Sequence, residues 1–364
     1  MTDLADLPLR DDLRGRTPYG APQLDVPVRL NTNESSYDLP IEVADAIVEA
    51  VRHEVRHLNR YPDREFTALR SDLAAYLTEA TGTPTPAEQI WAGNGSNEVL
   101  QQLLQAFGGP GRTALGFTPA YSMHPIISAA TGTRWIDGRR GDDFDLAPGL
   151  VADQVREHDP DVVFLCSPNN PTGTALHLDV VEAAYAATDR AVVIVDEAYA
   201  EFARPGTPAA TTLLTGRPRL VVTRTMSKAF ALAGARVGYL AADPAVCDAL
   251  RLVRLPYHLS SLTQAAARAA LAHADVLLAT VEAIKTQRDR IVAELPRHSL
   301  RPVPSDANFV LFGGMDDAHA AWERLLAAGV LVRDVGIPHH LRVTAGTPDE
   351  TTAFLEAVSQ LETL

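Results

Sequence analysis

Lysine is nearly absent from this chain. Among its 32 lysines and arginines only two, Lys228 and Lys285, are lysines, so arginine carries almost every positive charge. Arginine cannot be deprotonated in a protein, whereas a desolvated lysine can, and a neutral amine can form an imine with an aldehyde. Lys228 follows an apolar run and stands among small residues. It is therefore a candidate nucleophile, with a surface lysine at a helix start as the alternative.

Cysteine and long apolar runs are also scarce. Cys166 and Cys247 are far apart and form no Cys-x-x-Cys pair, so neither a disulfide framework nor a zinc site is expected. No apolar run approaches the roughly 20 residues of a membrane span, and the first residues lack a secretion-signal pattern. These features predict a cytoplasmic protein. His339 and His340 have no third ligand at metal-site spacing, so no metal is predicted.

The chain has an excess of negative charge and no block of lysines or arginines. Its net charge is −14 and its isoelectric point about 5.2, which argues against nucleic acid or an anionic membrane as the main partner. A hydrophobic fraction of 46% is ordinary for a globular protein. With 364 residues the chain is long for a single core, so two domains are expected.

Short apolar runs alternate with helical stretches between about residues 88 and 242. This alternation is typical of an α/β domain with a mostly parallel sheet, in which ligands bind at the carboxyl ends of the strands. The predicted strands are 90–91, 114–117, 162–166, 191–195, 220–223 and 237–241. Helical spacing of apolar residues also predicts helices over 39–58 and 66–81.

The rest of the chain divides around this domain. Residues 1–38 predict an N-terminal arm, 39–258 a large domain, and 259–364 a smaller α+β domain. The small domain is expected to contain one long helix over 263–295, strands at 308–312, 330–333 and 341–343, and helices near 317–327 and 348–361.

A glycine-rich turn, Gly93-Asn-Gly95-Ser96-Asn97-Glu98, follows the first predicted strand and opens a helix. Glycines let backbone N–H groups approach an anion, and a helix N-terminus favours negative charge, so the turn suits a phosphate. A dinucleotide site is the rival interpretation, but the third glycine and the acidic residue about 20 positions on are missing. A plain tight turn is the other alternative.

Polar residues follow other predicted strands. Asp196 ends a fully apolar strand, and a buried carboxylate needs a cationic partner, which a protonated pyridine nitrogen would supply. Tyr199, three residues on, could bond a phenolate oxygen. A magnesium-binding aspartate is the alternative, but no GxxxxGK[ST] motif supports it. The loop that holds Asn170 is made rigid by two prolines and a glycine, although by itself it is more often an ordinary loop.

Three arginines stand where they could bind anions. Arg236 could pair a phosphate with two hydrogen bonds. Arg333 and Arg342, at the ends of apolar runs, could hold an anionic substrate. Taken singly, each would more often be a solvated surface charge.

Together these motifs stand in the order that a pyridoxal-phosphate site needs. Four of them, Gly95-Ser96-Asn97, Asn170-Pro-Thr-Gly173, Asp196-Glu-Ala-Tyr199 and Ser227-Lys228 through Arg236, resemble the fold-type I aminotransferases. Five more resemble the histidinol-phosphate aminotransferase family in its actinobacterial form: Pro18-Tyr19, Leu30-Asn-Thr-Asn33-Glu34, Arg60-Tyr61-Pro62-Asp63, Val332-Arg333-Asp334 and Leu341-Arg342-Val343. The arm departs from the family, which often has Asn-Pro where this chain has Ser35-Ser36.

The resemblance implies an α/β fold-type I transferase with a mostly parallel, seven-stranded type of sheet, and an arm that packs on the small domain or a partner subunit. It implies that Lys228 binds the cofactor and moves protons, that Asp196 keeps the ring nitrogen protonated, and that Asn170 and Tyr199 bind the phenolate oxygen. Further cofactor contacts implied are Gly95, Ser96, Asn97, Tyr121, Thr225, Ser227, Arg236 and, in a homodimer with shared active sites, Tyr61 of the partner subunit. Substrate contacts implied are Tyr19, Asn33, Arg333 and Arg342.

The implied reaction is transamination of L-histidinol phosphate with 2-oxoglutarate, giving imidazole-acetol phosphate and L-glutamate in histidine biosynthesis. An aromatic aminotransferase for phenylalanine or tyrosine, and a phosphothreonine decarboxylase of related sequence, are alternatives within the pyridoxal enzymes. A non-catalytic pyridoxal-binding domain fused to a regulator is a third, but no DNA-binding module or basic face supports it.

Overall fold

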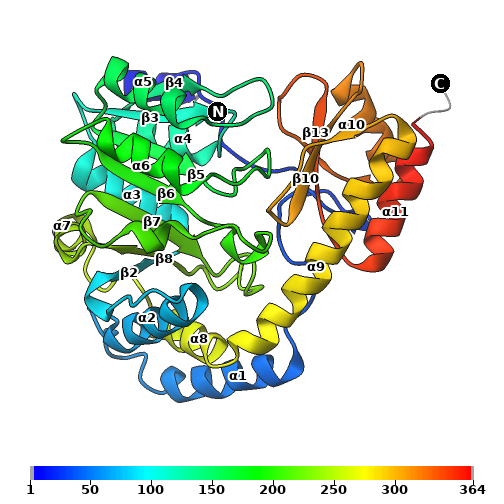
Figure 1. The fold of residues 1–364 in the computed structure, drawn as a ribbon. Helices are drawn as coiled ribbons and strands as arrows, with labels where there is room; N and C mark the ends of the chain where they lie inside the picture. The colour runs from blue at the N-terminus through cyan, green and yellow to red at the C-terminus, as the bar shows by residue number, and fades with distance from the viewer. Residues whose placement is uncertain (1–3, 362–364) are drawn as a thin grey trace.

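A computed structural model of the chain describes residues 4–361 (Figure 1). The outer ends of the predicted arm and small domain, 1–3 and 362–364, lie outside the described residues. Two main sheets organise the described chain, one of seven strands and one of four, and a short two-stranded sheet joins the arm to the second.

The larger sheet has the strand order β2-β8-β7-β6-β5-β3-β4. Only β8 runs in the opposite direction to the other six strands, so the predicted α/β fold with a mostly parallel sheet is confirmed. Its strands are β2 (Ile90–Gly93), β3 (Thr113–Thr118), β4 (Arg134–Arg139), β5 (Val162–Cys166), β6 (Val192–Asp196), β7 (Leu220–Thr225) and β8 (Gly238–Ala242). Strand β4 was not predicted, because its apolar pair, Trp135 and Ile136, stands between charged residues, and three of its six positions are exposed.

Helices accompany this sheet along the chain. They are α3 (Ser96–Phe107), α4 (Met123–Ala130), α5 (Pro148–His158), α6 (Leu178–Ala186) and α7 (Pro244–Val253). A separate layer of α1 (Ile41–Val55), α2 (Thr67–Thr81) and α8 (Ser261–Leu271) lies below β2 and β8 in Figure 1. The central strands β5 and β6 are buried along their whole length, which explains their continuous apolar runs.

The second sheet has the order β12-β13-β10-β9 and lies beside α9, α10 and α11 (Figure 1). Its strands are β9 (Arg301–Pro302), β10 (Phe309–Gly313), β12 (Arg333–Asp334) and β13 (His340–Thr344). The helices beside it are α9 (Ala274–Glu294), α10 (Ala318–Ala327) and α11 (Pro348–Ser359). The arm strand β1 (Val28–Arg29) pairs in parallel with β11 (Val330–Leu331). The boundaries predicted at 38 and 258 stay predictions.

Two predicted elements are divided in the structure. The predicted helix over 263–295 is wrong as a single element, because it breaks at His273 into α8, which packs on α1 and α2, and α9, which packs beside the second sheet. The predicted strand over 330–333 separates into β11 and β12, because Val330 pairs with the arm and Arg333 pairs with β13. In both cases the two halves pack against different parts of the chain.

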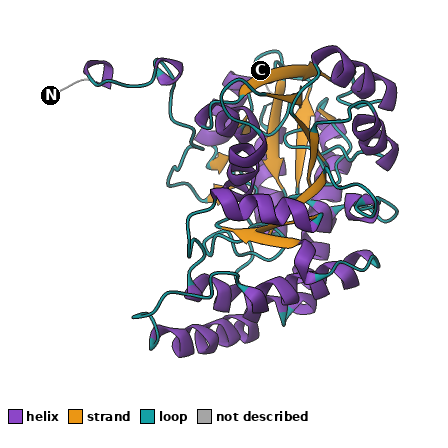
Figure 2. Cartoon of the chain, turned by 90° about the vertical axis from the view of Figure 1, so that its left-hand side faces the viewer, coloured by secondary structure: helices purple, strands orange, loops and turns teal. Residues whose placement is uncertain are grey.

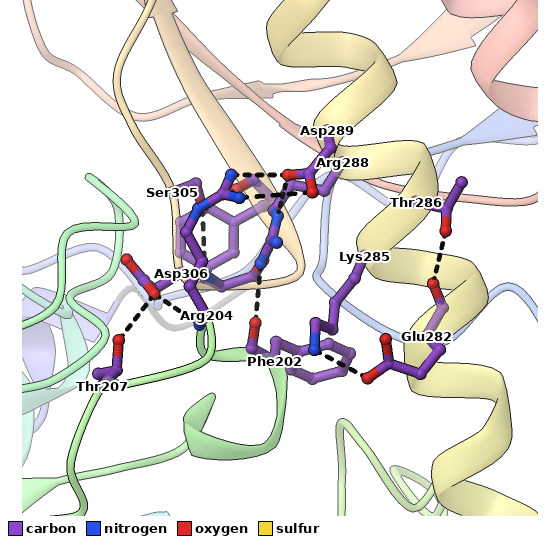
Figure 3. Close-up of polar contacts among 12 residues, drawn as sticks. Phe202, Arg204, Thr207, Glu282, Lys285, Thr286, Arg288, Asp289, Ser305 and Asp306 are labelled. Carbon is purple, nitrogen blue, oxygen red and sulfur yellow. Dashed lines mark hydrogen bonds and ion pairs between the residues drawn. The ribbon is translucent and has the colours of Figure 1, made fainter.

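A buried arginine of α9 joins the two parts of the molecule (Figure 3). Arg288 donates to the carbonyl of Phe202 at 2.8 Å and to that of Ala307 at 3.3 Å, and Asp289 pairs with Arg204 at 2.6 Å. Phe202 ends the short turn η4 (Ala200–Phe202) after β6, while Ala307 lies just before β10. These bonds fix the segment that follows β6 against the second sheet.

Candidate active site

A cavity of about 220 Å³ lies at the carboxyl ends of β5, β6 and β7. Its walls include ten of the predicted residues: Ser96, Asn97, Tyr121, Asn170, Asp196, Tyr199, Thr225, Ser227, Lys228 and Arg236. A second cavity, of about 320 Å³, shares Tyr121, Asn170, Tyr199 and Lys228 with the first and is also lined by Tyr19, Asn33, Arg333 and Arg342. The two cavities therefore meet at Lys228.

Tyr61 is not part of either cavity of its own chain. Its side chain is 80% exposed and stacks on Tyr257 with ring centroids 4.4 Å apart. Gly95 is the other predicted residue that lines neither cavity. It forms the turn beneath Arg236.

In the predicted phosphate cradle, the backbone of Gly95 packs closely against the guanidinium of Arg236. Gly95 adopts φ +84° just before α3 begins, and a Cβ atom there would collide with the guanidinium of Arg236. Arg236 donates to the hydroxyl of Ser227 at 3.3 Å. The first residues of α3, the guanidinium and the hydroxyl line the same cavity, a combination that suits a phosphate.

The carboxylate of Asp196 is buried at the end of β6 and has two side-chain partners. The hydroxyl of Thr223 donates to Oδ1 at 3.1 Å, and Nε2 of His124 lies 3.0 Å from Oδ2. The sequence had offered neither residue as part of the site. Thr223 could have been found, because it pairs in register with Asp196 on the neighbouring parallel strand. His124 comes from α4, and only the packing of that helix over β5 brings it here.

Tyr199 is the acceptor of two amides. Asn33 Nδ2 donates to its hydroxyl oxygen at 3.0 Å and Asn170 Nδ2 at 3.3 Å. Burial raises the pKa of Tyr199 to about 12, against the opposing effects of Arg342 and Asn33. The phenol therefore keeps its proton, and within the described residues that proton has no acceptor, so it can be donated into the cavity.

Lys228 follows β7 and its amine lies between the two cavities. Burial, and then the charges of Arg342 and Arg236, lower the pKa of Lys228 to about 8, although Glu34 acts in the opposite direction. At pH 7 roughly a tenth of such an amine is neutral, far more than for an ordinary lysine. Nζ donates to the backbone carbonyl of Thr32 at 3.1 Å. A neutral fraction of this size is what a nucleophilic lysine requires.

Arg342 is a buried cation without a carboxylate partner among the described residues. It sits in the middle of β13 rather than at a strand end, and donates to Asn170 Oδ1 at 2.6 Å and to the carbonyl of Asn31 at 2.8 Å. Its Nε has no protein acceptor, and burial, with Arg333 nearby, lowers the pKa of Arg342 to about 10. A buried positive charge of this kind suits an anionic ligand.

Arg333 adds a second guanidinium to the same cavity, 5.9 Å above the ring of Tyr19. In this geometry the ring of Tyr19 stabilises the positive charge of Arg333, and the N–H groups of the guanidinium can still bind a ligand.

These groups fit pyridoxal phosphate on chemical grounds. The cradle at α3 matches its phosphate, the buried carboxylate of Asp196 matches its ring nitrogen, and the amine of Lys228 matches its aldehyde. In a mostly parallel seven-stranded sheet, this set defines a pyridoxal-phosphate enzyme of fold type I. The chain belongs to the aminotransferase class I and II family, whose sequence model matches residues 26–358. It is therefore an aminotransferase, and its cofactor is pyridoxal phosphate.

Individual proteins similar to this chain have more specific names than the family. The chain is 64% identical over 361 residues to a protein of Frankia casuarinae named histidinol-phosphate aminotransferase, covering 98% of this chain and 91% of the relative. A protein of the same name from Paenarthrobacter aurescens is 63% identical over 357 residues, covering 98% and 95%. The crystal structure of histidinol-phosphate aminotransferase from Sinorhizobium meliloti, in complex with pyridoxal-5'-phosphate, has a TM-score of 0.82 at 27% identity, covering 93% and 91%.

Two further findings concern residues 4–361. None of the helices there is both long enough and apolar enough to span a bilayer. Among the same residues, no group of three or more histidine, cysteine, aspartate or glutamate side chains could hold a metal ion.

Proposed function

We propose that this chain transfers the amino group of L-histidinol phosphate to 2-oxoglutarate, giving imidazole-acetol phosphate and L-glutamate in histidine biosynthesis. The observation that carries the proposal is the pair of guanidiniums, Arg333 and Arg342, which face the cavity that reaches Lys228. A phosphate monoester and a dicarboxylate each need such cations at the end remote from the reacting carbon. The relatives that share 64% and 63% of their residues with the chain bear the name of this activity.

Lys228 is the proton carrier in this proposal. When bound, pyridoxal phosphate supplies an aldehyde that takes up the amino group and a ring that accepts electrons. Nζ of Lys228 would remove a proton from the substrate carbon that bears the nitrogen and return it to the carbon on the other side of that nitrogen, a 1,3-proton shift, and its lowered pKa suits both steps. Asp196 holds the ring nitrogen in its protonated form, and His124 and Thr223 fix the carboxylate.

The remaining residues bind and orient. Asn170 and Tyr199 donate hydrogen bonds to the phenolate oxygen, and Tyr121 stacks on the ring. The phosphate is held by the backbone of Gly95 and Ser96 and by Ser227 and Arg236, and Asn97 and Thr225 are further cofactor contacts. Substrate contacts come from Tyr19, Asn33, Arg333 and Arg342. Because the two half-reactions follow one another in one cavity, the same guanidiniums receive both anionic substrates.

A homodimer with shared active sites completes the proposal. Tyr61 is exposed on its own chain, and three apolar side chains, Leu252, Leu255 and Ile41, are also between 77% and 86% exposed. The start of the arm, with the turns Leu4–Asp6 and Asp11–Leu13, reaches out from the body of the chain (Figure 2). We infer that Tyr61 enters the cavity of the other subunit. A cytoplasmic location is supported by the two free cysteines.

The test is a comparison of kcat/KM for L-histidinol phosphate, L-phenylalanine, L-tyrosine and phosphothreonine, each with 2-oxoglutarate. Histidinol phosphate is expected to lead by at least about tenfold, equivalent to roughly 1.4 kcal/mol of transition-state binding. A higher value for phenylalanine or tyrosine would assign the chain to the aromatic aminotransferases. Release of carbon dioxide from phosphothreonine would assign it to the decarboxylases.

A further inference from the structure

The arm crosses the active site with three successive backbone carbonyls turned toward side chains from other parts of the chain. The carbonyls of residues 31–33 accept hydrogen bonds, in order, from Arg342 Nη2 at 2.8 Å, Lys228 Nζ at 3.1 Å and Asn308 Nδ2 at 3.1 Å. One short stretch of backbone therefore meets the substrate-binding guanidinium, the reactive amine and the second sheet.

This stretch of the arm contains a residue in a strained backbone conformation. Asn33 adopts the left-handed conformation, φ +59°, and is 1% exposed. Asparagine tolerates this region better than most residues, but the conformation still needs support from its surroundings.

Thr344, the last residue of β13, supplies that support twice. Its hydroxyl accepts a hydrogen bond from the backbone N–H of Asn33 at 3.1 Å and donates one to Asn33 Oδ1 at 2.9 Å. Thr344 is itself buried, and its backbone N–H donates to the carbonyl of Leu30 at 3.0 Å. A single hydroxyl thus fixes both the backbone and the side chain of the turn.

The amine of Lys228 depends on the arm for its position. Within the described residues, the carbonyl of Thr32 is its one hydrogen-bond partner. The charged and titratable groups around it act without a direct bond: Glu34 from the arm, Arg342 from β13, Arg236 from the cradle, and Tyr121, Asp196 and Tyr199 from the cavity walls. Movement of the carbonyl would leave the amine without an anchor.

We propose that Thr344 is a positioning residue for Lys228: through its two bonds to Asn33 it fixes the turn that aims the Thr32 carbonyl at the amine. Thr344 lines neither cavity, so it acts only through the arm. The inference rests on the proposed function in that Lys228 is taken as the group that moves the proton.

A matched pair of substitutions tests this role. Thr344→Val has nearly the same shape but no hydroxyl, whereas Thr344→Ser keeps the hydroxyl. In the full-length chain freed of cofactor, acetic anhydride reacts with lysine amines, and peptide mass spectrometry gives the ratio of modified Lys228 to modified Lys285. Lys285 is a built-in reference, because it lies in α9 and pairs with Glu282 at 2.8 Å.

We expect Thr344→Val to raise this ratio about threefold or more. Loss of the hydrogen bond to the Thr32 carbonyl frees the Lys228 amine and favours its neutral form. Thr344→Ser should remain close to wild type. Equal ratios in all three proteins would overturn the proposal. If Thr344→Val does not fold, Thr344→Ala removes the same hydroxyl and both of its bonds to Asn33, and an unchanged ratio in that variant would overturn the proposal equally.

The holoenzyme gives a second readout. Thr344→Val should lower kcat about tenfold, and Thr344→Ser should keep kcat close to that of the wild type. An unchanged kcat in the valine variant contradicts the proposal. The labelling ratio uses no substrate, so it still decides the role of Thr344 if the chain proves to act on a different amino donor.

Discussion

The two lysines of this chain have different surroundings, and this difference can be tested directly. Replacing Lys228 with alanine removes the only amine in the cavity, so we expect no measurable turnover. Lys228→Arg should also be inactive, because a guanidinium stays charged. Lys285→Arg should keep full activity. Borohydride reduction of the cofactor-loaded protein should label the peptide that holds Lys228, and a label on Lys285 would overturn the assignment.

The charge state of Lys228 should respond to Arg342. Burial first, and then the positive charge of Arg342, lower the pKa of Lys228 to about 8. Arg342→Met removes that repulsion, so the pKa of Lys228 should rise and the neutral fraction at pH 8 should fall. Acetylation of Lys228 followed against pH should therefore shift to higher pH in the variant, with Lys285 as the internal reference. A shift to lower pH, or none, contradicts this explanation.

At the scale of elements, the start of α3 shows how backbone geometry forms a site. Gly95→Ala places a methyl group at φ +84° and against the guanidinium of Arg236, so we expect the cradle to open. The dissociation constant of pyridoxal phosphate should increase at least about tenfold, or roughly 1.4 kcal/mol. Gly149→Ala, in α5, meets open space and is the matched control. Equal cofactor affinity in the two variants would mean that the cradle does not hold the phosphate.

Helix α9 carries the buried Arg288, which donates to two backbone carbonyls, and Lys285, which forms an ion pair with Glu282 (Figure 3). Replacing these two residues should have different effects on stability. Arg288→Met leaves the buried carbonyls of Phe202 and Ala307 without their donor, which should lower the free energy of unfolding by about 2–4 kcal/mol. Lys285→Met, one turn earlier, removes only its pair with Glu282 and should cost less than about 1 kcal/mol. Urea denaturation of both variants measures the difference, and a similar loss in each would contradict it.

At the scale of the whole molecule, the proposed dimer predicts complementation between inactive chains. The first chain, Tyr61→Ala, lacks the ring that each subunit would lend to its partner, and the second chain, Lys228→Ala, lacks the amine. In a mixed dimer one cavity keeps Lys228 and Arg236 from the first chain and receives Tyr61 from the second. Partial recovery of activity after mixing is expected. No recovery, with mixed dimers demonstrated by mass spectrometry, would argue against shared sites.

Much of the fold was determined by local sequence. The apolar runs that became β5 and β6 are buried on both faces, so the sequence marked them without any tertiary information. The polar motifs after these strands had to meet at one edge, because parallel strands place their carboxyl ends together. The same local reasoning missed β4, an edge strand whose apolar pair, Trp135 and Ile136, stands between charged residues.

The chemistry of the site divides in the same way. Sequence alone marked Lys228 by its rarity and Asp196 by the apolar strand before it. Tertiary structure decided that His124 lies against Asp196, that Lys228 Nζ donates to the carbonyl of Thr32 in the arm, and that Thr344 of β13 contacts the next arm residue, Asn33. The physical reason is range: hydrophobic periodicity and turn chemistry act between neighbours in sequence, whereas these contacts join residues between 72 and 311 positions apart and exist only once helix, sheet and arm have packed.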